Sequence, residues 1–283
     1  MADIMDRISH MFGGFTNSQK TIASYMMDNM NSISFDTLEE LSGKIGVSTT
    51  TVIRFARALG YDGFSEMQKD LQADLRDKVS LPERLSESSA KKVRQDELLR
   101  SSFKNDLNNI QKTLEGINDR DMSSALELIE KADNVYVLGL RSSYALAHYM
   151  TTRLGQIRKN VHLITSVGMT YPEEIVSSSP NDACIAYLFP RYSKISANII
   201  MWMRRRGTKI VLFTNSNYSA VKDYGDIILP CSIHGISFKN SFAAPICLIN
   251  YIAAAIAARN YDESRTVLEE TEEILTHGYY LGL

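Results

Sequence analysis

The 283-residue chain has few of the residues that build disulfide frameworks and metal sites. It contains three cysteines and five histidines, and none falls at CxxC or Cys/His ligand spacing. Cys184, Cys231 and Cys247 are far apart and lie in apolar surroundings, so we expect buried free thiols in a reducing compartment. The sequence therefore predicts no metal site and no cofactor.

Long apolar runs are also missing. A membrane-spanning helix needs about 20 apolar residues, and the nearest candidate, from Pro245 to Ala258, is too short and contains Asn250. The N-terminal segment MADIMDR lacks the charged-then-apolar pattern of a signal peptide. We therefore expect no membrane partner and a cytoplasmic location.

The chain lacks the excess of positive charge that is typical of nucleic-acid-binding proteins. Its formal net charge is −2, with 31 Lys and Arg against 33 Asp and Glu. Residues 1–80 contain eight basic and eleven acidic residues, a difference of −3. Any DNA contact made by this part of the chain would therefore depend on a small local cluster of cations.

Length and composition indicate two globular domains. The chain is 44% hydrophobic and 23% charged, as in ordinary globular proteins, and domains usually contain about 100–200 residues. We assign residues 1–77 to a first domain and residues 107–283 to a second. Residues 78–106 are polar and Ser-rich at their start and are predicted to form the linker.

Helical periodicity dominates the first domain. It predicts helices over residues 16–30 and 63–75, and a short helix capped by Asp36 or Thr37. Gly46 ends that short helix, and Ser48 is a good N-cap for the next one. Two short helices joined by a glycine-containing turn are typical of an all-α helix-turn-helix domain. An α-helical dimerisation module is the alternative.

The helix that follows Ser48 has two chemically different sides. One side is apolar, and the other carries hydroxyls and guanidiniums. Arginine can read guanine edges or bind phosphates, and threonine can contact phosphates or thymine methyls. This pattern predicts a DNA recognition helix, and we assign DNA contacts to Lys44, Ser48, Thr49, Thr50, Thr51, Arg54 and Arg57.

Beyond residue 134, short apolar segments alternate with helical ones. The alternation predicts an α/β domain with a five-stranded parallel sheet flanked by helices. We expect strands over residues 135–138, 161–164, 183–188, 209–213 and 227–229. The helices between and after them are expected over residues 144–157, 195–206, 243–258 and 266–276.

Polar residues follow three of these strands at the starts of the next segments. Ligands of parallel sheets lie beyond the carboxyl ends of the strands, where helix N-termini favour anions. We therefore expect an anion site, although the serines could serve only as N-caps and the arginines could form interface salt bridges. The candidate residues are Arg141, Ser142, Ser143, Arg191, Tyr192, Ser193, Thr214, Asn215 and Ser216, with Ser241 at the border.

Residues 35–42 (FDTLEELS), 47–55 (VSTTTVIRF) and 59–64 (LGYDGF) resemble the N-terminal domain of RpiR/MurR-type bacterial transcription regulators. Residues 107–260 resemble the SIS (sugar isomerase) domain that follows it in such proteins. The resemblance implies a regulator that binds a double-stranded DNA operator as a homodimer, or alternatively as a tetramer. It also implies that the SIS domain senses a small anionic, sugar-phosphate-like metabolite and thereby modulates operator binding.

Two loops depart from the SIS pattern. Arg141 stands where the second glycine of Gly-x-Gly-x-Ser is expected, and residues 188–193 replace Ser-x-Ser-Gly-x-Thr, keeping only the last hydroxyl, Ser193. Glycine allows close backbone approach to a phosphate, which arginine and proline restrict. We therefore expect a subgroup with altered sugar-phosphate loops, in which two arginine side chains rebuild the anion site. A domain kept only for dimerisation is the alternative.

A sugar-phosphate isomerase of the SIS type is a further alternative. Such a reaction needs a positioned general base. The glutamate that is common in the family after the third strand is Ile195 here, which leaves Glu173 and Glu174 as candidate bases. The sequence therefore favours a regulator that is not an enzyme.

Overall fold

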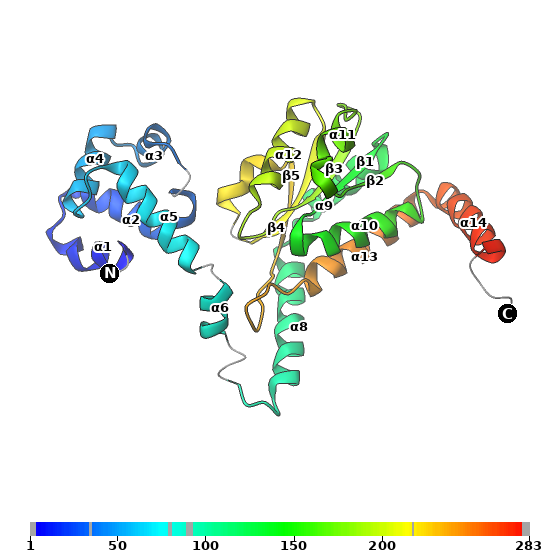
Figure 1. Cartoon of the computed structure of the whole chain (residues 1–283), viewed down its shortest axis with the longest axis horizontal. Helices are drawn as coiled ribbons and strands as arrows, with labels where there is room; N and C mark the ends of the chain where they lie inside the picture. Colours follow the sequence, from blue (N-terminus) through cyan, green and yellow to red (C-terminus); the bar gives the residue numbers. More distant parts are fainter. Residues whose placement is uncertain (1–3, 34–35, 79–80, 89–92, 217, 279–283) are drawn as a thin grey trace. The chain divides into compact units, whose positions relative to one another are not determined.

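The computed structural model describes residues 4–33, 36–78, 81–88, 93–216 and 218–278 (Figure 1). The chain divides into two compact units, residues 1–87 and 88–283. The helix α6 (Leu81–Glu87) and the first residues of α8 (Leu98–Gly116) fall within the range 78–106 that the sequence predicts as a linker. Part of that range is therefore helical, and α8 belongs to the second unit.

The first unit is all-α, as predicted. Its elements are α1 (Ile4–Met11), α2 (Asn17–Ile33), α3 (Leu38–Ile45), α4 (Thr49–Ala58), α5 (Phe64–Lys78) and α6, with a 3-10 turn at Phe12–Gly14. Side chains from α1 to α5 form one apolar core around Phe55. The helix α1, which was not predicted from the sequence, supplies the fully buried Ile4 and Ile8 to this core.

Local signals set the ends of α3 and α4. Thr37 and Glu40 form the capping box of α3, so of the two predicted caps Thr37 is the one used. Gly46 adopts a left-handed conformation with φ 75° and ends α3. Ser48 then caps α4 and accepts a hydrogen bond from the Thr51 amide at 3.2 Å.

The second unit contains a five-stranded parallel sheet of order β2-β1-β3-β4-β5, which confirms the predicted fold class. The strands are β1 (Val135–Leu138), β2 (Val161–Ile164), β3 (Ala183–Tyr187), β4 (Lys209–Asn215) and β5 (Ile227–Cys231). The helices are α8, α9 (Asp119–Lys131), α10 (Tyr144–Gly155), α11 (Tyr171–Ile175), α12 (Lys194–Arg205), α13 (Ala243–Arg259) and α14 (Tyr261–Gly278).

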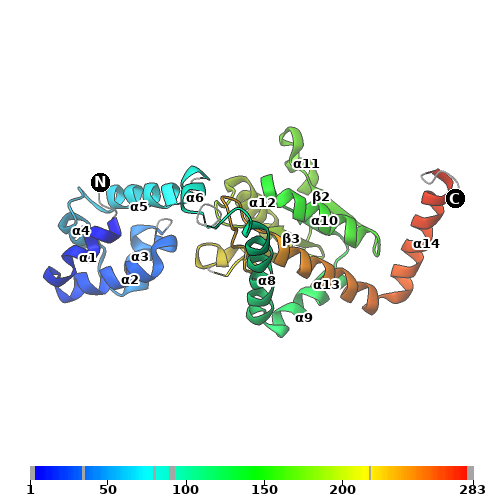
Figure 2. The same cartoon turned by 90° about the horizontal axis from the view of Figure 1, so that it is seen from below.

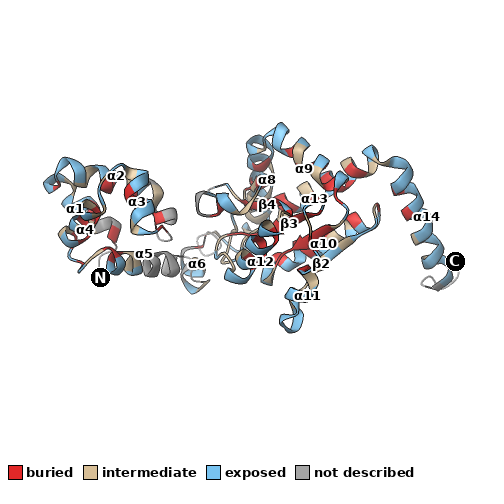
Figure 3. Ribbon diagram, turned by 90° about the horizontal axis from the view of Figure 1, so that it is seen from above, coloured by how far each residue is buried: buried red, intermediate tan, exposed pale blue. Residues whose placement is uncertain are grey.

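Helices cover both faces of this sheet (Figure 2). The helices α9, α10 and α13 pack on one face, and α11 and α12 pack on the other. Figure 3 shows the buried residues concentrated in the strands and on the sheet-facing sides of the helices. The strands β1 and β3 and most of β4 are buried on both faces because they lie between two helical layers, whereas the edge strands β2 and β5 are only partly buried.

Two further expectations concern cysteines and membrane spans. Cys184 and Cys231 are buried, and burial raises the pKa of the Cys184 thiol to about 12. Cys247 is exposed, so the expectation of a buried thiol is wrong there: it lies on the outer side of α13. Within the described ranges, no single helix is long and apolar enough to cross a membrane; α13 and α14 reach that length and composition only together and are bent by 108°.

Candidate functional site

The outer side of α4 carries the candidate nucleic-acid interface. Val52, Phe55 and Ala56 are fully buried and fix the orientation of the helix. Residues at positions i, i+3, i+4 and i+7 lie along one helix face. This spacing places Thr50, Ile53, Arg54 and Arg57 on the outer side, which we call the α4 stripe. Thr50, Arg54 and Arg57 are exposed and Ile53 is half-buried.

Several of the predicted DNA-contacting residues have structural partners. The Lys44 ammonium lies 2.6 Å from the Asp36 carboxylate. Burial opposes the charged form of Lys44, but the hydrogen bond and charge attraction from Asp36 outweigh it and raise the Lys44 pKa. The Ser48 hydroxyl is 2.8 Å from that of Thr51 and caps the helix. Lys44, Ser48 and Thr51 therefore help to hold α3 and α4 in place.

The remaining predicted contacts are less constrained. The Arg57 Nε donates to the Asp62 carbonyl oxygen at 3.2 Å, which ties this side chain to the α4–α5 turn. Thr49 is half-buried at the first turn of α4. Thr50 and Arg54 make no side-chain hydrogen bond or ion pair with any described residue. Their polar groups are therefore available to a ligand.

Some of the charged side chains of this unit are paired with one another. The Arg7 guanidinium lies 2.9 Å from the Asp70 carboxylate and above the Tyr61 ring, with 4.5 Å to its centroid. The Tyr61 hydroxyl also donates to Asp70. Asp36 is paired with Lys44. Two acids and two bases are thus paired inside the unit, which leaves the charge difference of −3 over residues 1–80 unchanged, and Arg54 and Arg57 lie outside these ion pairs.

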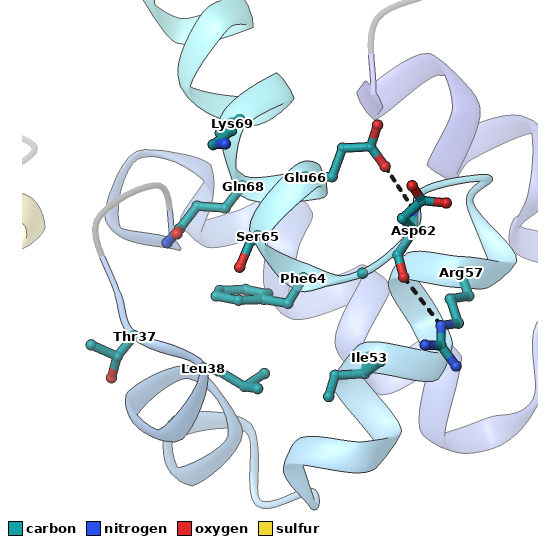
Figure 4. Close-up of a pocket in the computed structure, with 11 residues that line it drawn as sticks. Thr37, Leu38, Ile53, Arg57, Asp62, Phe64, Ser65, Glu66, Gln68 and Lys69 are labelled. Carbon is teal, nitrogen blue, oxygen red and sulfur yellow. Dashed lines mark hydrogen bonds between the residues drawn. The ribbon is translucent and has the colours of Figure 1, made fainter.

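A groove of about 590 Å³ opens beside the α4 stripe. Figure 4 shows its walls: the start of α3, Ile53 and Arg57 of α4, and the α4–α5 turn with the first turns of α5. Leu38, Ile53 and Phe64 give the groove an apolar side, while Arg57 and Lys69 give it positive charge. The Asp62 amide donates to the Glu66 carboxylate at 2.6 Å and closes the turn.

The carboxyl edge of the sheet carries the candidate anion site. Arg141 follows β1, and Arg191 follows β3, which pairs directly with β1. Both arginines have left-handed backbones, with φ 56° and 65°. Both are exposed, and neither guanidinium has a hydrogen bond or ion pair with the described part of the chain.

The positive φ values show that the backbone of these two loops keeps a conformation that glycine favours. The expectation that the arginines restrict close approach of a phosphate to the backbone stays a prediction. Arg141 and Arg191 both stand where the SIS pattern has glycine, and both keep a glycine-like backbone conformation. For a residue other than glycine this conformation costs about 1–2 kcal/mol. The loops therefore keep a backbone geometry that their own residues disfavour.

Gly139 explains how tightly the first loop is packed. A Cβ atom at this position would lie 2.4 Å from the Ser143 carbonyl oxygen, so only glycine fits. Ser143 is buried and Ser142 is exposed, and the Ser143 side chain does not cap α10. Ser193 does act as an N-cap, because its hydroxyl accepts from the Ser196 amide at 3.2 Å.

The ends of β3 and β4 meet through side chains. The Tyr192 hydroxyl donates to the Asn215 side-chain oxygen at 2.9 Å, and the buried Thr214 hydroxyl donates to the same oxygen at 3.3 Å. Burial raises the pKa of Tyr192 despite its proximity to Thr214. Ser216 is exposed beyond them. The structure thus brings Tyr192, Thr214 and Asn215 together, as the sequence predicts for one strand edge.

Ser241 connects this edge to α8. Its hydroxyl donates to the Asp106 carboxylate at 2.6 Å and accepts from the Ala243 amide at 3.3 Å. The neighbouring Phe242 ring lies 5.7 Å, centroid to centroid, from Phe189, which immediately precedes the Arg191 loop. Asp106 was missed at the sequence level because 135 residues separate it from Ser241.

The two glutamates considered as catalytic bases differ in their surroundings. The Glu174 carboxylate accepts from the Thr165 amide at 3.0 Å and the Ser166 amide at 3.1 Å, and from the Thr165 hydroxyl. It thereby holds the loop after β2. Glu173 is exposed on α11. Among the described residues, no three His, Cys, Asp or Glu side chains form a group suited to a metal ion.

Comparison with known proteins agrees with this architecture. Residues 2–78 match the helix-turn-helix domain of the rpiR family, and residues 128–255 match the SIS domain. An uncharacterized HTH-type transcriptional regulator of Haemophilus influenzae is 23% identical over 80% of this chain and 79% of its own length. Another, from Caldanaerobacter subterraneus, is 22% identical over 98% of both chains.

Solved structures share the fold. The sugar isomerase domain of an RpiR transcription factor from Sphaerobacter thermophilus is 25% identical, with a TM-score of 0.60 over 62% of this chain and 99% of that one. The Vibrio vulnificus NanR protein complexed with ManNAc-6P has a TM-score of 0.63 at 19% identity, over 96% of this chain and 98% of that one. The chain is therefore an RpiR-type protein, in which a helix-turn-helix domain of the rpiR family precedes a SIS domain.

Proposed function

We propose that this protein is a transcription regulator that binds a double-stranded DNA operator through the α4 stripe. The observation that carries the proposal is the exposed Arg54, which projects from a helix-turn-helix without any described partner. An unpaired guanidinium on such a helix suits a guanine edge in the major groove. The names of the relatives, HTH-type transcriptional regulators, support the same function.

The contacts divide the predicted DNA residues into two groups. Thr50 and Arg54 reach bases, Thr49 lies at the helix start close to them, and Arg57 contacts the backbone. Lys44, Ser48 and Thr51 orient the helix through their own partners. A gel shift with the Arg54→Ala/Arg57→Ala variant tests the assignment, with Lys20→Ala on α2 as the control. Undiminished binding by the double variant would contradict it.

We also propose that the strand edge binds a small anionic metabolite of the phosphosugar class. The support comes from Arg141 and Arg191, which follow neighbouring strands, have no partner among the described residues and are each held in a costly backbone conformation. Strained residues that persist in a fold tend to cluster at functional sites. Guanidinium forks can replace the backbone amides of a glycine loop because they bind phosphate bidentately.

The other predicted residues of this site fall into three groups. Ser142 and Ser216 are exposed at the same strand ends and are proposed to contact the ligand. Tyr192, Thr214 and Asn215 bond to one another and shape its floor. Ser143, Ser193 and Ser241 have buried, capping or bridging positions and support the loops. The NanR structure, described as a complex with ManNAc-6P, supports a phosphosugar as the ligand class.

A polar contact zone between α8 and the segment after β5 offers a route from the strand edge to the linker. Besides the Asp106–Ser241 bond, Asn109 donates to the His234 carbonyl oxygen at 2.7 Å and accepts from Ser232 at 2.8 Å. Thr113 accepts from the Ser232 amide at 2.8 Å. Because α8 directly follows the linker, a ligand that shifts Ser241 would shift α8.

Asp106→Asn tests this route, because it keeps the shape of the side chain and weakens its bond to Ser241. We expect the variant to bind both metabolite and operator while the metabolite changes operator affinity less than in the wild type. The matched control is Asp121→Asn, on the exposed side of α9. An unchanged response in Asp106→Asn would contradict the route.

We further propose that α8 forms the interface of a homodimer. Leu99, Phe103, Leu107 and Leu114 lie on one side of the helix with 65–70% of their surface exposed. Such an apolar stripe is unfavourable in water unless a partner covers it. A second copy is the natural occupant, since dimeric helix-turn-helix proteins bind paired half-sites. Sedimentation of Phe103→Glu should show a monomer; an unchanged assembly would contradict this interface.

The regulator is preferred over an isomerase. Ile195 cannot transfer a proton, and the Glu174 carboxylate is occupied by two amides and a hydroxyl. A general base must reach the substrate proton. Turnover of sugar phosphates by the purified protein would favour the isomerase instead.

A further inference from the structure

Ile53 is the unexpected member of the α4 stripe. It is an apolar residue between the hydroxyl of Thr50 and the guanidiniums of Arg54 and Arg57, on the side of the helix that faces away from the core. Ile45 and Val47, which are also half-buried, pack against the core of this unit. Within the described residues, Ile53 does not belong to that packing.

The surroundings of Ile53 indicate what could cover it. It lines the groove beside α4 together with Leu38 and Phe64 (Figure 4). The rim of this groove is polar and carries both signs of charge, positive from Arg57 and Lys69 and negative from Asp62 and Glu66. A small apolar wall surrounded by charged residues does not suit a hydrophobic protein interface, whose buried core is depleted in charge.

Duplex DNA matches this arrangement. In the major groove only thymine presents a methyl group, and apolar side chains contact it while neighbouring arginines bind guanine edges or phosphates. We propose that Ile53 determines specificity by contacting the C5 methyl of a thymine in each half-site. The inference rests on the proposed operator-binding function and adds a residue and a base preference to it.

The hydrogen bond made by Arg57 distinguishes its role from that of Arg54. Its Nε is held by the Asp62 carbonyl oxygen, so the side chain leans toward the α4–α5 turn (Figure 4). Arg54, one residue beyond Ile53, makes no such hydrogen bond to any residue that the structure describes. Arg54 and Ile53 therefore read adjacent bases, and Arg57 binds phosphate without sequence preference.

Deoxyuridine provides the direct test, because it is thymine without the C5 methyl. The full-length protein is first used to select an operator from a random duplex library. Each thymine is then replaced singly by deoxyuridine, and affinities of the wild type, Ile53→Ala and Ile53→Val are measured. Met27→Ala, at an exposed apolar position on α2, is the matched control.

We expect one deoxyuridine position per half-site to weaken wild-type binding by about fourfold, the ratio that corresponds to one buried methyl-sized group. Ile53→Ala should lose affinity for the thymine operator and show no further loss at that position, while Met27→Ala should behave as the wild type. Ile53→Val should keep part of the discrimination, which separates a lost contact from a misfolded domain.

Two results would overturn the inference. One is that the affinity of Ile53→Ala falls, at every deoxyuridine position, by the same factor as the affinity of the wild type. The other is a wild type that discriminates at no thymine. If the full-length protein selects no duplex at all, the operator-binding function itself is wrong and the role of Ile53 fails with it.

Discussion

The α4 stripe and the carboxyl edge of the sheet both present exposed arginines, but they do so at different cost. Arg54 and Arg57 lie in a regular helix, whose backbone conformation is favourable for arginine. Arg141 and Arg191 lie in left-handed backbone, which is unfavourable for any residue other than glycine. On α4, the spacing of the side chains along the helix is enough to place the arginines on one face. At the carboxyl edge of the sheet, the packing of the loops must hold the arginines in an unfavourable backbone conformation.

The two regions also differ in internal pairing. Around α4, neighbouring cations are bound within the unit: Arg7 to Asp70, Lys44 to Asp36, and Arg57 to a carbonyl oxygen. At the strand edge, neither arginine has a described partner. If the proposed function holds, we expect DNA affinity to depend on a few contacts and ligand affinity to depend on both edge arginines together.

The largest effect should follow from removing both edge arginines. Each charge-assisted hydrogen bond contributes about 1.5–3 kcal/mol, so Arg141→Ala/Arg191→Ala should weaken binding of a phosphosugar by about 100-fold or more. Calorimetric titration and ligand-dependent melting against a phosphosugar panel would measure this. Arg205→Ala, an exposed arginine at the end of α12, is the control. Retained binding by the double variant would place the anion elsewhere.

A second effect concerns the packing that holds the first loop. Gly139→Ala places a Cβ 2.4 Å from the Ser143 carbonyl oxygen, and such overpacking costs about 1–3 kcal/mol. Denaturant unfolding should show this loss. Gly116→Ala is a suitable comparison, since nothing lies within 4 Å of a Cβ there. An unchanged free energy of unfolding in Gly139→Ala would mean that the loop after β1 can shift to make room for the Cβ atom. Loop packing would then not be what holds Arg141 in its left-handed conformation.

A smaller effect separates backbone strain from ligand binding at the same residue. Arg191→Gly should relieve the left-handed conformation and keep or raise the free energy of unfolding, by up to about 1 kcal/mol after the greater freedom of glycine in the unfolded chain is subtracted. The same variant should bind phosphosugars less tightly. A less stable Arg191→Gly protein would show that the arginine stabilises the loop and that its strain has no functional meaning.

The smallest effect tests the capping of α3, which positions the helix before α4. The Thr37 amide donates to Glu40 and lowers the Glu40 pKa, and the Thr37 hydroxyl adds to this shift. A lowered folded-state pKa means that the stabilisation is present at pH values above about 4.5 and is lost as the pH falls through the folded pKa. In the full chain, Glu40→Ala should increase hydrogen exchange in α3 at neutral pH and change it little in acid. An equal change at both pH values would show that ionised Glu40 is not needed.

Local patterns in the sequence determined most of the architecture. The strands over residues 135–138 and 161–164 match β1 and β2 to the residue, and the cap of α4 lies at Ser48 as predicted. Apolar alternation, N-cap residues and glycine stops act within a few residues along the chain. The sheet, the parallel direction of its strands and the helix-turn-helix therefore followed from sequence alone, and so did the polar character of the strand edge, whereas the order β2-β1-β3-β4-β5 did not.

Tertiary structure decided which of the polar residues are available. The sequence could not show that Lys44 is bound by Asp36, that Ile53 stands outside the core, or that Ser241 bonds to Asp106. Nor could it show that two arginines adopt the backbone of the glycines they replace. Each of these facts depends on contacts between segments that are distant in sequence, or on loop packing strong enough to override a local backbone preference. Such contacts and such packing produce no periodic pattern in the sequence, so they could not be predicted from it.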